Sequence, residues 1–96
     1  MRPPLNIALL RALGDELRAR RLSLQFSQEG LAAAAGIDRT TIARIELARV
    51  QSSIPVLVAL AEAMNVEPAT MLEGAMARYR KELRSIARPK AANKKS

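Results

Sequence analysis

The polar residues of this chain that could do chemistry are concentrated at 38–46, in the segment "DRTTIARIE". Arg39 and Arg44 carry guanidinium groups, whose planar fork donates paired hydrogen bonds to carboxylates, phosphates or the acceptor edges of bases. Thr40 and Thr41 add hydroxyls that both donate and accept. The segment therefore favours recognition by hydrogen bonding over proton-transfer chemistry.

Each of these side chains also has a purely structural interpretation. Thr40 and Thr41 could act only as capping groups in the first turn of a helix, and Asp38 fits an N-cap better than a base contact. Arg44 could pair with an acid such as Glu46, or remain solvated. The choice depends on the elements that position the segment.

The composition excludes several classes of function. The 96 residues suit one domain, and the absence of cysteine and histidine excludes disulfides, the usual zinc sites and histidine-based catalysis. Phe26 and Tyr79 are the only aromatic residues, which argues against a base-stacking platform for single-stranded nucleic acid. With no glycine-rich phosphate loop or paired carboxylates, we expect no enzyme, metal, cofactor or small-molecule ligand.

The distribution of charge is more informative than its sum of +7. Residues 1–77 contain eight basic and eight acidic residues, whereas residues 78–96 contain eight basic residues opposed by Glu82 alone. No apolar run approaches the ~20 residues that span a bilayer, and charged residues interrupt the N-terminal segment, so we expect no membrane contact. The chain is predicted to be cytoplasmic.

Helical periodicity runs through the chain, and no alternating pattern predicts a strand. The helices are expected at about 5–21, 27–35, 38–47, 54–64 and 68–87. Ser27 and Asp38 suit the N-caps of the second and third helices, and Ser52 or Ser53 suits that of the fourth. Pro89 would end the fifth.

The second and third predicted helices must cross steeply, because only about three residues join them. Ala32 and Ala35 let the two backbones approach, and Gly36 supplies a left-handed corner. Ile42 and Ile45 then fix the third helix from inside. The small residues therefore hold the polar face of the third helix outward.

This pattern resembles the helix-turn-helix of the phage-repressor (Cro/CI, XRE) family, over about Leu13 to Leu72. The matching residues are, in order, Gln28, Ala32, Gly36, Ile37, Ile42 and Ile45. The resemblance implies an all-α, compact, four- to five-helix lambda-repressor-like domain with a central helix-turn-helix at 27–47. The segments "LGDELRARRLSLQFSQEGLA" and "IPVLVALAEAMNVEPATML" match the flanking helices of that family.

The resemblance also implies roles for individual residues. Base contacts in the major groove fall to Arg39, Thr40 and Arg44. The candidates for phosphate contacts are Ser27, Gln28, Thr41, Arg49 and Gln51. The family often pairs the acid at the end of the third helix with an arginine at the end of the first, which here implies a structural ion pair between Arg21 and Glu46.

The sequence departs from the family pattern after the third helix. The family usually has glycine two residues after this glutamate, and here Ala48 stands there; the loop "RVQSS" also lacks the usual proline. We therefore expect a longer or more helical exit from the third helix.

Apolar residues recur at spacings of four, three, four and three along the last helix. Leu72 and Met76 are expected to cover the core, which leaves Tyr79, Leu83 and Ile86 as candidate dimer contacts. The alternative is a longer intramolecular helix. The chain thus divides into a domain at 1–77, an extension at 78–88 and a disordered basic tail at 89–96, which either attracts phosphates or only adds solubility.

These features predict a sequence-specific regulator that binds double-stranded DNA, with a repressor at a palindromic operator as the favoured form. Palindromes require two-fold symmetric proteins, so a homodimer is expected. Such a protein would be associated with the nucleoid. The alternative is an antitoxin-like protein whose main partner is a toxin or another regulator and whose DNA binding serves autoregulation.

Overall fold

The computed structural model describes residues 6–94 and the side chains as far as Ile86. The five helices are α1 (Ile7–Ser23), α2 (Gln28–Ala35), α3 (Arg39–Glu46), α4 (Ile54–Ala63) and α5 (Pro68–Lys94). The described residues form no strand, and the predicted all-α fold with a central helix-turn-helix and a long last helix is confirmed.

Short polar side chains start three of the helices. Asn6 Oδ1 accepts a hydrogen bond from the amide of Leu9, and the hydroxyls of Ser27 and Ser53 accept from the amides of Gly30 and Val56, the third residues of α2 and α4. Each bond satisfies a first-turn amide that has no partner inside its helix. Ser27 is the predicted cap, Ser53 is the one used of the two candidates for α4, and Leu5, the predicted start of the first helix, lies outside the described residues.

Residues with a left-handed backbone conformation follow the ends of α1 to α4. α1 runs to Ser23, two residues beyond its predicted end, because Gln25 adopts a φ of 62° and the amide of Phe26 bonds back to the carbonyl of Arg21. Asn65 takes the same conformation after α4, with a φ of 59°. These residues do what glycine does after α2, at a modest conformational cost.

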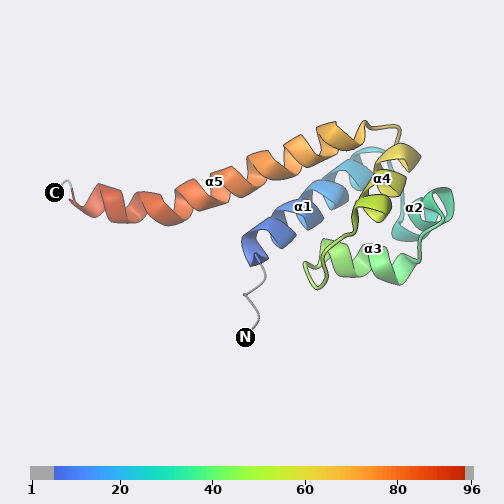
Figure 1. Ribbon diagram of the computed structural model, residues 1–96, viewed down its shortest axis with the longest axis horizontal. Helices are drawn as coiled ribbons and strands as arrows, with labels where there is room; N and C mark the ends of the chain where they lie inside the picture. The colour runs from blue at the N-terminus through green and yellow to red at the C-terminus, as the bar shows by residue number, and fades with distance from the viewer. Residues whose placement is uncertain (1–5, 95–96) are drawn as a thin grey trace.

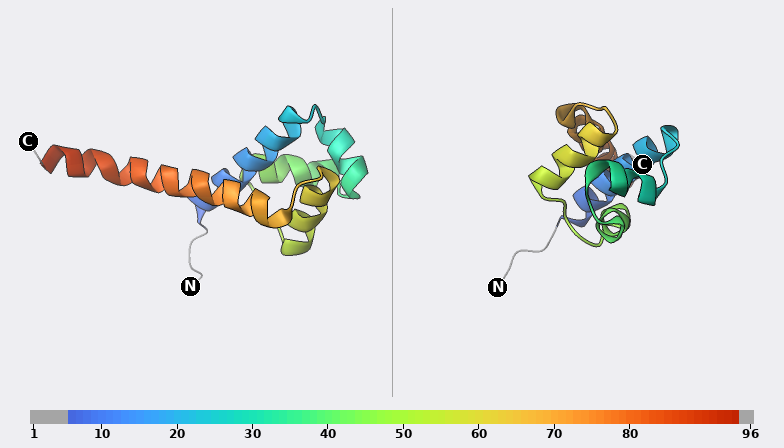
Figure 2. Two further views of the ribbon diagram at one scale, coloured as in Figure 1. Left: turned by 90° about the horizontal axis from the view of Figure 1, so that it is seen from above. Right: turned by 90° about the vertical axis from the view of Figure 1, so that its right-hand side faces the viewer.

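Helix α1 lies between α3 and α5 (Figures 1 and 2). The globule is formed by α1 to α4 and the first half of α5, and the second half of α5 projects beyond it (Figure 1). The chain is accordingly elongated, with principal extents of 54 × 36 × 20 Å. α3 and α5 therefore lie on opposite sides of the molecule.

The core is made by one apolar side of each helix. Its largest fully buried side chains are Leu17, Leu31, Ile42, Ile45, Leu60 and Met71. The close approach of α1 to α3 depends on Gly14, since a Cβ there would overlap the carbonyl oxygen of Ile45. Any larger residue at position 14 would push the end of α3 away from α1.

The predicted register of α5 against the core is wrong by one residue. Met71 and Ala75 are fully buried, whereas Leu72 is 45% exposed and Met76 is only partly buried. α5 packs on α1 through its small residues, because a Cβ at Gly74 would overlap the carboxylate of Glu16. Periodicity alone favoured the larger side chains, but the distance between the two helices selects the smaller ones.

The predicted end of α5 also differs from the structure. The helix continues through Pro89 to Lys94, in place of an end at Ala87 and a disordered tail at 89–96. Proline has a helical φ of about −65°, so a helix already formed can pass through it with the loss of one backbone hydrogen bond. Residues 95–96 lie outside the described part of the chain.

Glu16 joins α1 to α5 through a buried carboxylate that is not among the predicted site residues. Its two oxygens accept hydrogen bonds from Arg20 on α1 and from Arg78 on α5, the latter at 2.8 Å. Burial raises the pKa of Glu16, but the hydrogen bonds from Arg78 and Arg20 and their charges outweigh it, so the pKa lies below its ordinary value. The four-residue spacing of Glu16 and Arg20 predicts the first of these hydrogen bonds.

We expect the fold to lose stability in acid through Glu16. A carboxyl whose pKa is lower in the folded state binds fewer protons there, so its stabilisation is complete above the unfolded value of 4.5 and is lost as the pH falls through the folded pKa. Glu16→Gln should lower the free energy of unfolding by about 1–3 kcal/mol at neutral pH. Its thermal midpoint, followed by circular dichroism, should fall less steeply below pH 4.5 than that of the wild type.

Asp15→Asn is the matched control, because Asp15 is the exposed neighbour of Glu16. It should retain the wild-type dependence on pH. If the thermal midpoints of the wild type and of Glu16→Gln fell equally steeply below pH 4.5, the proposed role of Glu16 would be wrong.

The chain turns directly after α3, which ends at Glu46, one residue before its predicted end. Ala48 itself takes the left-handed conformation, with a φ of 58°, and the amides of Ala48 and Arg49 bond to the carbonyls of Ile45 and Arg44. The turn that glycine usually makes is therefore formed by alanine, at a cost in conformational strain.

Ala48→Gly should stabilise the protein by roughly 0.5–1 kcal/mol, because relief of this strain exceeds the entropy that glycine adds to the unfolded chain. Ala43→Gly, in the middle of α3, should have the opposite sign and destabilise it by about 1 kcal/mol. Urea unfolding of the two variants checks both values. A loss of stability in Ala48→Gly would show that the turn is not strained.

Candidate nucleic-acid interface

The helix-turn-helix is formed by α2, a three-residue turn and α3. Gly36 ends α2 with a φ of 68°, and the amide of Ile37 bonds to the carbonyl of Ala32 at 3.1 Å. Ala32 is 9% exposed at the crossing of the two helices. The alanines and the glycine thus have the structural roles that the sequence predicts.

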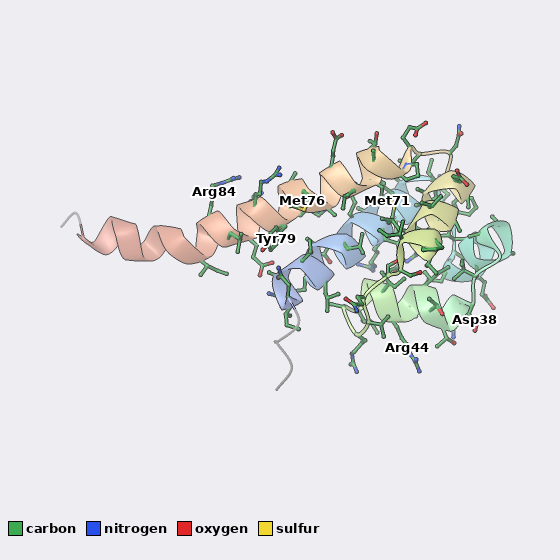
Figure 3. The ribbon with its side chains drawn as sticks, viewed as in Figure 1. Asp38, Arg44, Met71, Met76, Tyr79 and Arg84 are labelled. Atoms are coloured by element: carbon green, nitrogen blue, oxygen red, sulfur yellow. The ribbon has the colours of Figure 1, made fainter. Side chains whose placement is uncertain are left out.

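Helix α3 has one buried side and one exposed side. Ile42 and Ile45 are fully or almost fully buried, whereas Arg39, Thr40 and Arg44 are exposed. Figure 3 shows Arg44 pointing away from the other helices, on the same side as Asp38. The three predicted base-contact residues therefore share one accessible surface, and Thr41 lies partly buried at its edge.

Asp38 has the predicted N-cap position without a capping hydrogen bond, and the alternative ion pair of Arg44 is not seen within the described residues. Asp38 occupies the N-cap position of α3, but its side chain accepts no hydrogen bond from the first turn. Arg44 forms no ion pair within the described residues, since Glu46 is bound by Arg21 and Gln28. The first-turn amides of α3 and the Arg44 guanidinium are both left available to a ligand.

A network of four side chains connects α1, α2 and α3. Arg21 donates from Nε and Nη2 to the two carboxylate oxygens of Glu46, at 2.7 and 2.9 Å, and from Nη1 to the carbonyl of Phe26 at 2.9 Å. The hydrogen bond to Glu46 raises the pKa of Arg21 further above its ordinary value, against the opposing effect of burial. The structure thus brings together the predicted pair, with both side chains almost completely buried.

Gln28 extends this network to the exposed face. Its Nε2 donates to Glu46 at 3.1 Å and its Oε1 accepts from Arg39 Nη1 at 3.3 Å. The amide that the sequence assigns to phosphate is therefore bound to protein groups here, and it connects a buried ion pair to an exposed arginine. No pattern in the sequence predicts this role, because it depends on the crossing of α2 and α3.

The other predicted phosphate contacts lie on either side of α3. Ser27 is exposed at the start of α2, beside a shallow hollow that Arg21, Gln28 and Arg39 also line. Arg49 and Gln51 are exposed in the loop that follows α3. The exposed face of α3 is thus bordered at one end by the first turn of α2 and at the other by this loop.

The predicted dimer contacts are separated by the structure. Tyr79 is partly buried, and its hydroxyl accepts a hydrogen bond from Asn6 Nδ2 at 3.0 Å. Leu83 and Ile86 are 43% and 66% exposed on the projecting half of α5. Tyr79 thus packs on its own chain, whereas the other two are exposed.

Two further classes of site receive no support within residues 6–94. The described side chains form no cluster of three or more acidic residues that could hold a metal ion. No described helix is both long enough and apolar enough to cross a membrane.

Arg21→Ala should lower the free energy of unfolding by about 3–5 kcal/mol, because it leaves Glu46 buried and without its charged partner. Arg18→Ala removes an exposed arginine of the same helix and should change stability by less than about 0.5 kcal/mol. Urea denaturation measures both. Equal stability of the two variants would show that the Arg21–Glu46 pair does not hold α3.

Comparisons with known proteins agree with this geometry. A family model described as helix-turn-helix matches residues 17–71, more than half of the chain. The structure is similar to the restriction-modification controller protein C.AhdI from Aeromonas hydrophila, with 32% identity over 65% of this chain and 94% of that one and a TM-score of 0.63. No curated protein matches the sequence.

Two further solved structures are similar. The hypothetical transcription factor NHTF from Neisseria is 28% identical over 75% of this chain and 83% of that one, with a TM-score of 0.64. The clp gene regulator ClgR from Corynebacterium glutamicum has a TM-score of 0.79 over 92% of this chain and 90% of that one, and at 23% identity it shows the fold alone. The chain belongs to the phage-repressor-type (XRE) helix-turn-helix family, whose members are DNA-binding transcriptional regulators and not enzymes.

Proposed function

We propose that this protein is a transcriptional repressor that binds a palindromic operator as a homodimer, with α3 in the major groove. The observation that carries the proposal is the accessible surface of α3, on which Arg39, Thr40 and Arg44 are exposed while Ile42 and Ile45 fix the helix from inside. A short helix held outward in this way fits the width of the major groove.

The electrostatics of this surface support an anionic ligand. Arg39, Arg44 and Arg49 are exposed along α3 and its exit, and none of them forms an ion pair within the described residues. Glu46 is already paired with Arg21, and the exposed acidic residues beside these three arginines are Asp38 and Glu29. A domain with no net charge in its first 77 residues therefore presents a locally positive face.

The two groups of predicted phosphate contacts fit the two edges of a groove. The first turn of α2, with Ser27 and Gln28, would bind the phosphates of one strand, where backbone amides and the helix dipole favour an anion. Arg49 and Gln51, after α3, would bind the other strand, and Thr41 lies between. These contacts fix the position of α3, while its arginines discriminate between bases.

A dimer on an inverted repeat covers at least one turn of DNA, so repression by exclusion of RNA polymerase is the simplest consequence of binding. The similarity to a restriction-modification controller protein and to a transcription factor supports a regulatory role. The exposed Leu83 and Ile86 offer a contact for the second copy.

Selection of bound duplexes from a random library, at two salt concentrations, tests the proposal. We expect an inverted repeat with half-site centres about 34 Å apart, and at least one guanine in each half-site. Salt-sensitive binding without an enriched sequence would contradict sequence-specific repression.

Single arginine variants then separate base contacts from phosphate contacts. Arg44→Ala should cost about 1–3 kcal/mol of binding free energy and relax specificity at one base pair of each half-site. Arg49→Ala should weaken binding to all sequences alike and reduce the salt slope by about one. Fluorescence anisotropy with the selected operator and single-base variants measures both, with the exposed Arg18→Ala as the control. An unchanged base preference in Arg44→Ala would contradict its assignment.

A further inference from the structure

The projecting half of α5 carries basic side chains that no acidic group of the chain neutralises. Arg80, Lys81 and Arg84 are exposed and form no ion pair within the described residues. These three residues form the basic face of α5. It is separate from the arginines of α3, and the recognition of DNA by α3 does not use it.

Few acidic groups oppose this basic face. Glu82 is the one acidic residue in 78–96, and it is bound by Arg11 of α1. Glu73 is exposed, but it lies seven residues before Arg80, which is about two turns of the helix. Further basic residues follow in the sequence, so the positive charge extends beyond the basic face; they are Arg88, Lys90, Lys94 and Lys95.

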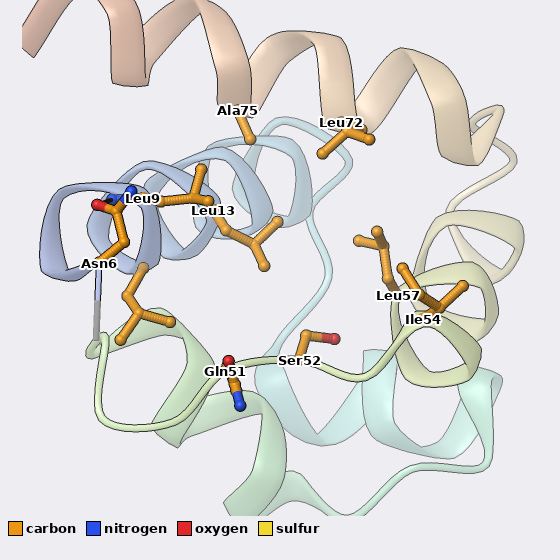
Figure 4. Close-up of a pocket in the computed structure, with 10 residues that line it drawn as sticks. Asn6, Leu9, Leu13, Gln51, Ser52, Ile54, Leu57, Leu72 and Ala75 are labelled. Atoms are coloured by element: carbon orange, nitrogen blue, oxygen red, sulfur yellow. Dashed lines mark hydrogen bonds between the residues drawn. The ribbon is translucent and has the colours of Figure 1, made fainter. Parts of the chain in front are cut away.

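Helix geometry directs the basic face away from the globule. Ala75 is fully buried, and Arg84 follows it by nine residues, or about two and a half turns, on the opposite side of the helix. Met71, which is also fully buried, and Arg80 have the same spacing. Figure 4 shows Leu72 and Ala75 pointing from α5 towards the cavity of about 250 Å³ that they line together with residues of α1 and α4. The inward side of α5 therefore packs on the globule, and the basic face is open to solvent.

We propose that the basic face of α5 binds the phosphate backbone of a second DNA duplex, so that one chain connects two duplexes. The first duplex is the one bound by α3, and in this respect the proposal rests on the proposed function. The second contact adds an activity to it, the bridging of DNA.

A single duplex does not reach both surfaces. Helix α1 lies between α3 and α5 (Figures 1 and 2), and Figure 3 shows Arg84 on the side of α5 remote from α3, whereas Arg44 points the opposite way. The molecule measures 54 × 36 × 20 Å, and DNA is stiff over a persistence length of about 500 Å. A duplex on α3 would have to bend sharply around the whole globule to meet Arg84, so the duplex on α5 is a different one.

The residues of the basic face favour phosphates over an apolar or aromatic partner. All three are cationic, and the exposed Leu83 and Ile86 lie outside the face. Arg80 and Arg84 are one turn apart, about 6 Å along the helix axis, so both can meet the closely spaced charges of a DNA backbone. Phosphate contacts release counterions and carry no base information. Binding of the second duplex should therefore depend strongly on salt and not on sequence.

Capture of a second duplex tests the proposal. The operator obtained by selection is immobilised on beads, the full chain is bound to it, and a short fluorescent duplex of unrelated sequence is added. The wild type should retain the fluorescent duplex at about 50 mM salt and release most of it at about 200 mM.

Charge reversal identifies the surface that holds the second duplex. Arg80→Glu and Arg84→Glu should each weaken its capture about tenfold, because a phosphate contact is replaced by repulsion. Arg18→Glu makes the same change of charge at an exposed arginine of α1 and should leave capture unchanged within about twofold. All three variants should bind the operator alone with wild-type affinity, measured by fluorescence anisotropy, which also shows that they are folded.

The other outcomes overturn different statements. A wild-type chain that binds the operator and captures no second duplex would overturn the surface on α5 and leave the repressor intact. Equal capture by the wild type, Arg80→Glu and Arg84→Glu would mean that another surface, such as α3 of a second copy, holds the second duplex. A tenfold loss of operator affinity in Arg84→Glu would place α5 and α3 on the same duplex and exclude bridging.

The second surface can also be tested if selection enriches no operator. Two duplexes of unrelated sequence, one immobilised and one fluorescent, then replace the operator pair. A loss of capture in Arg84→Glu but not in Arg18→Glu would support the basic face although the proposed repressor had failed. Equal capture by the two variants would overturn both proposals.

Discussion

The ion pair between Arg21 and Glu46 is the interaction on which the orientation of α3 depends. It joins the last turn of α1 to the last residue of α3, almost completely out of contact with solvent, and it satisfies both carboxylate oxygens. An ion pair buried in this way contributes little net free energy compared with an apolar contact, but it tolerates very few geometries. The main contribution of this ion pair is therefore to fix the orientation of α3. The hydrogen bonds from Gln28 to Glu46 and from Arg39 to Gln28 extend this constraint to Arg39 at the surface.

Helix α1 separates two surfaces with different tasks. On one side it fixes α3 through Arg21 and through the close contact at Gly14, and on the other it binds α5 through Glu16 and Arg11. The surface proposed to bind DNA and the surface proposed to bind a second copy thus share one support without sharing residues. Changes on either surface can accumulate without disturbing the other.

The helix-turn-helix could be predicted from the sequence because local rules determine it. Only glycine turns freely at position 36, and the isoleucines of α3 recur with the period of a helix. The register of α5 could not be predicted in this way, since Met71 and Ala75 are buried in preference to Leu72 and Met76 by the distance to α1, which no local pattern contains. Glu16 was missed for the same reason: its second partner, Arg78, is 62 residues away. Left-handed conformations at Gln25, Ala48 and Asn65 were missed because none of these residues is glycine.

The contact at Gly14 has a consequence for how the specificity of such a protein changes. A Cβ at this position would meet the backbone of α3 at Ile45 and Glu46, and backbone cannot rotate out of the way as a side chain can. A chain that accepted alanine there would have to tilt α3 as a rigid unit, and the exposed arginines would move with it. A substitution inside the protein, far from any base, could therefore change the preferred operator while every side chain that touches DNA stays the same.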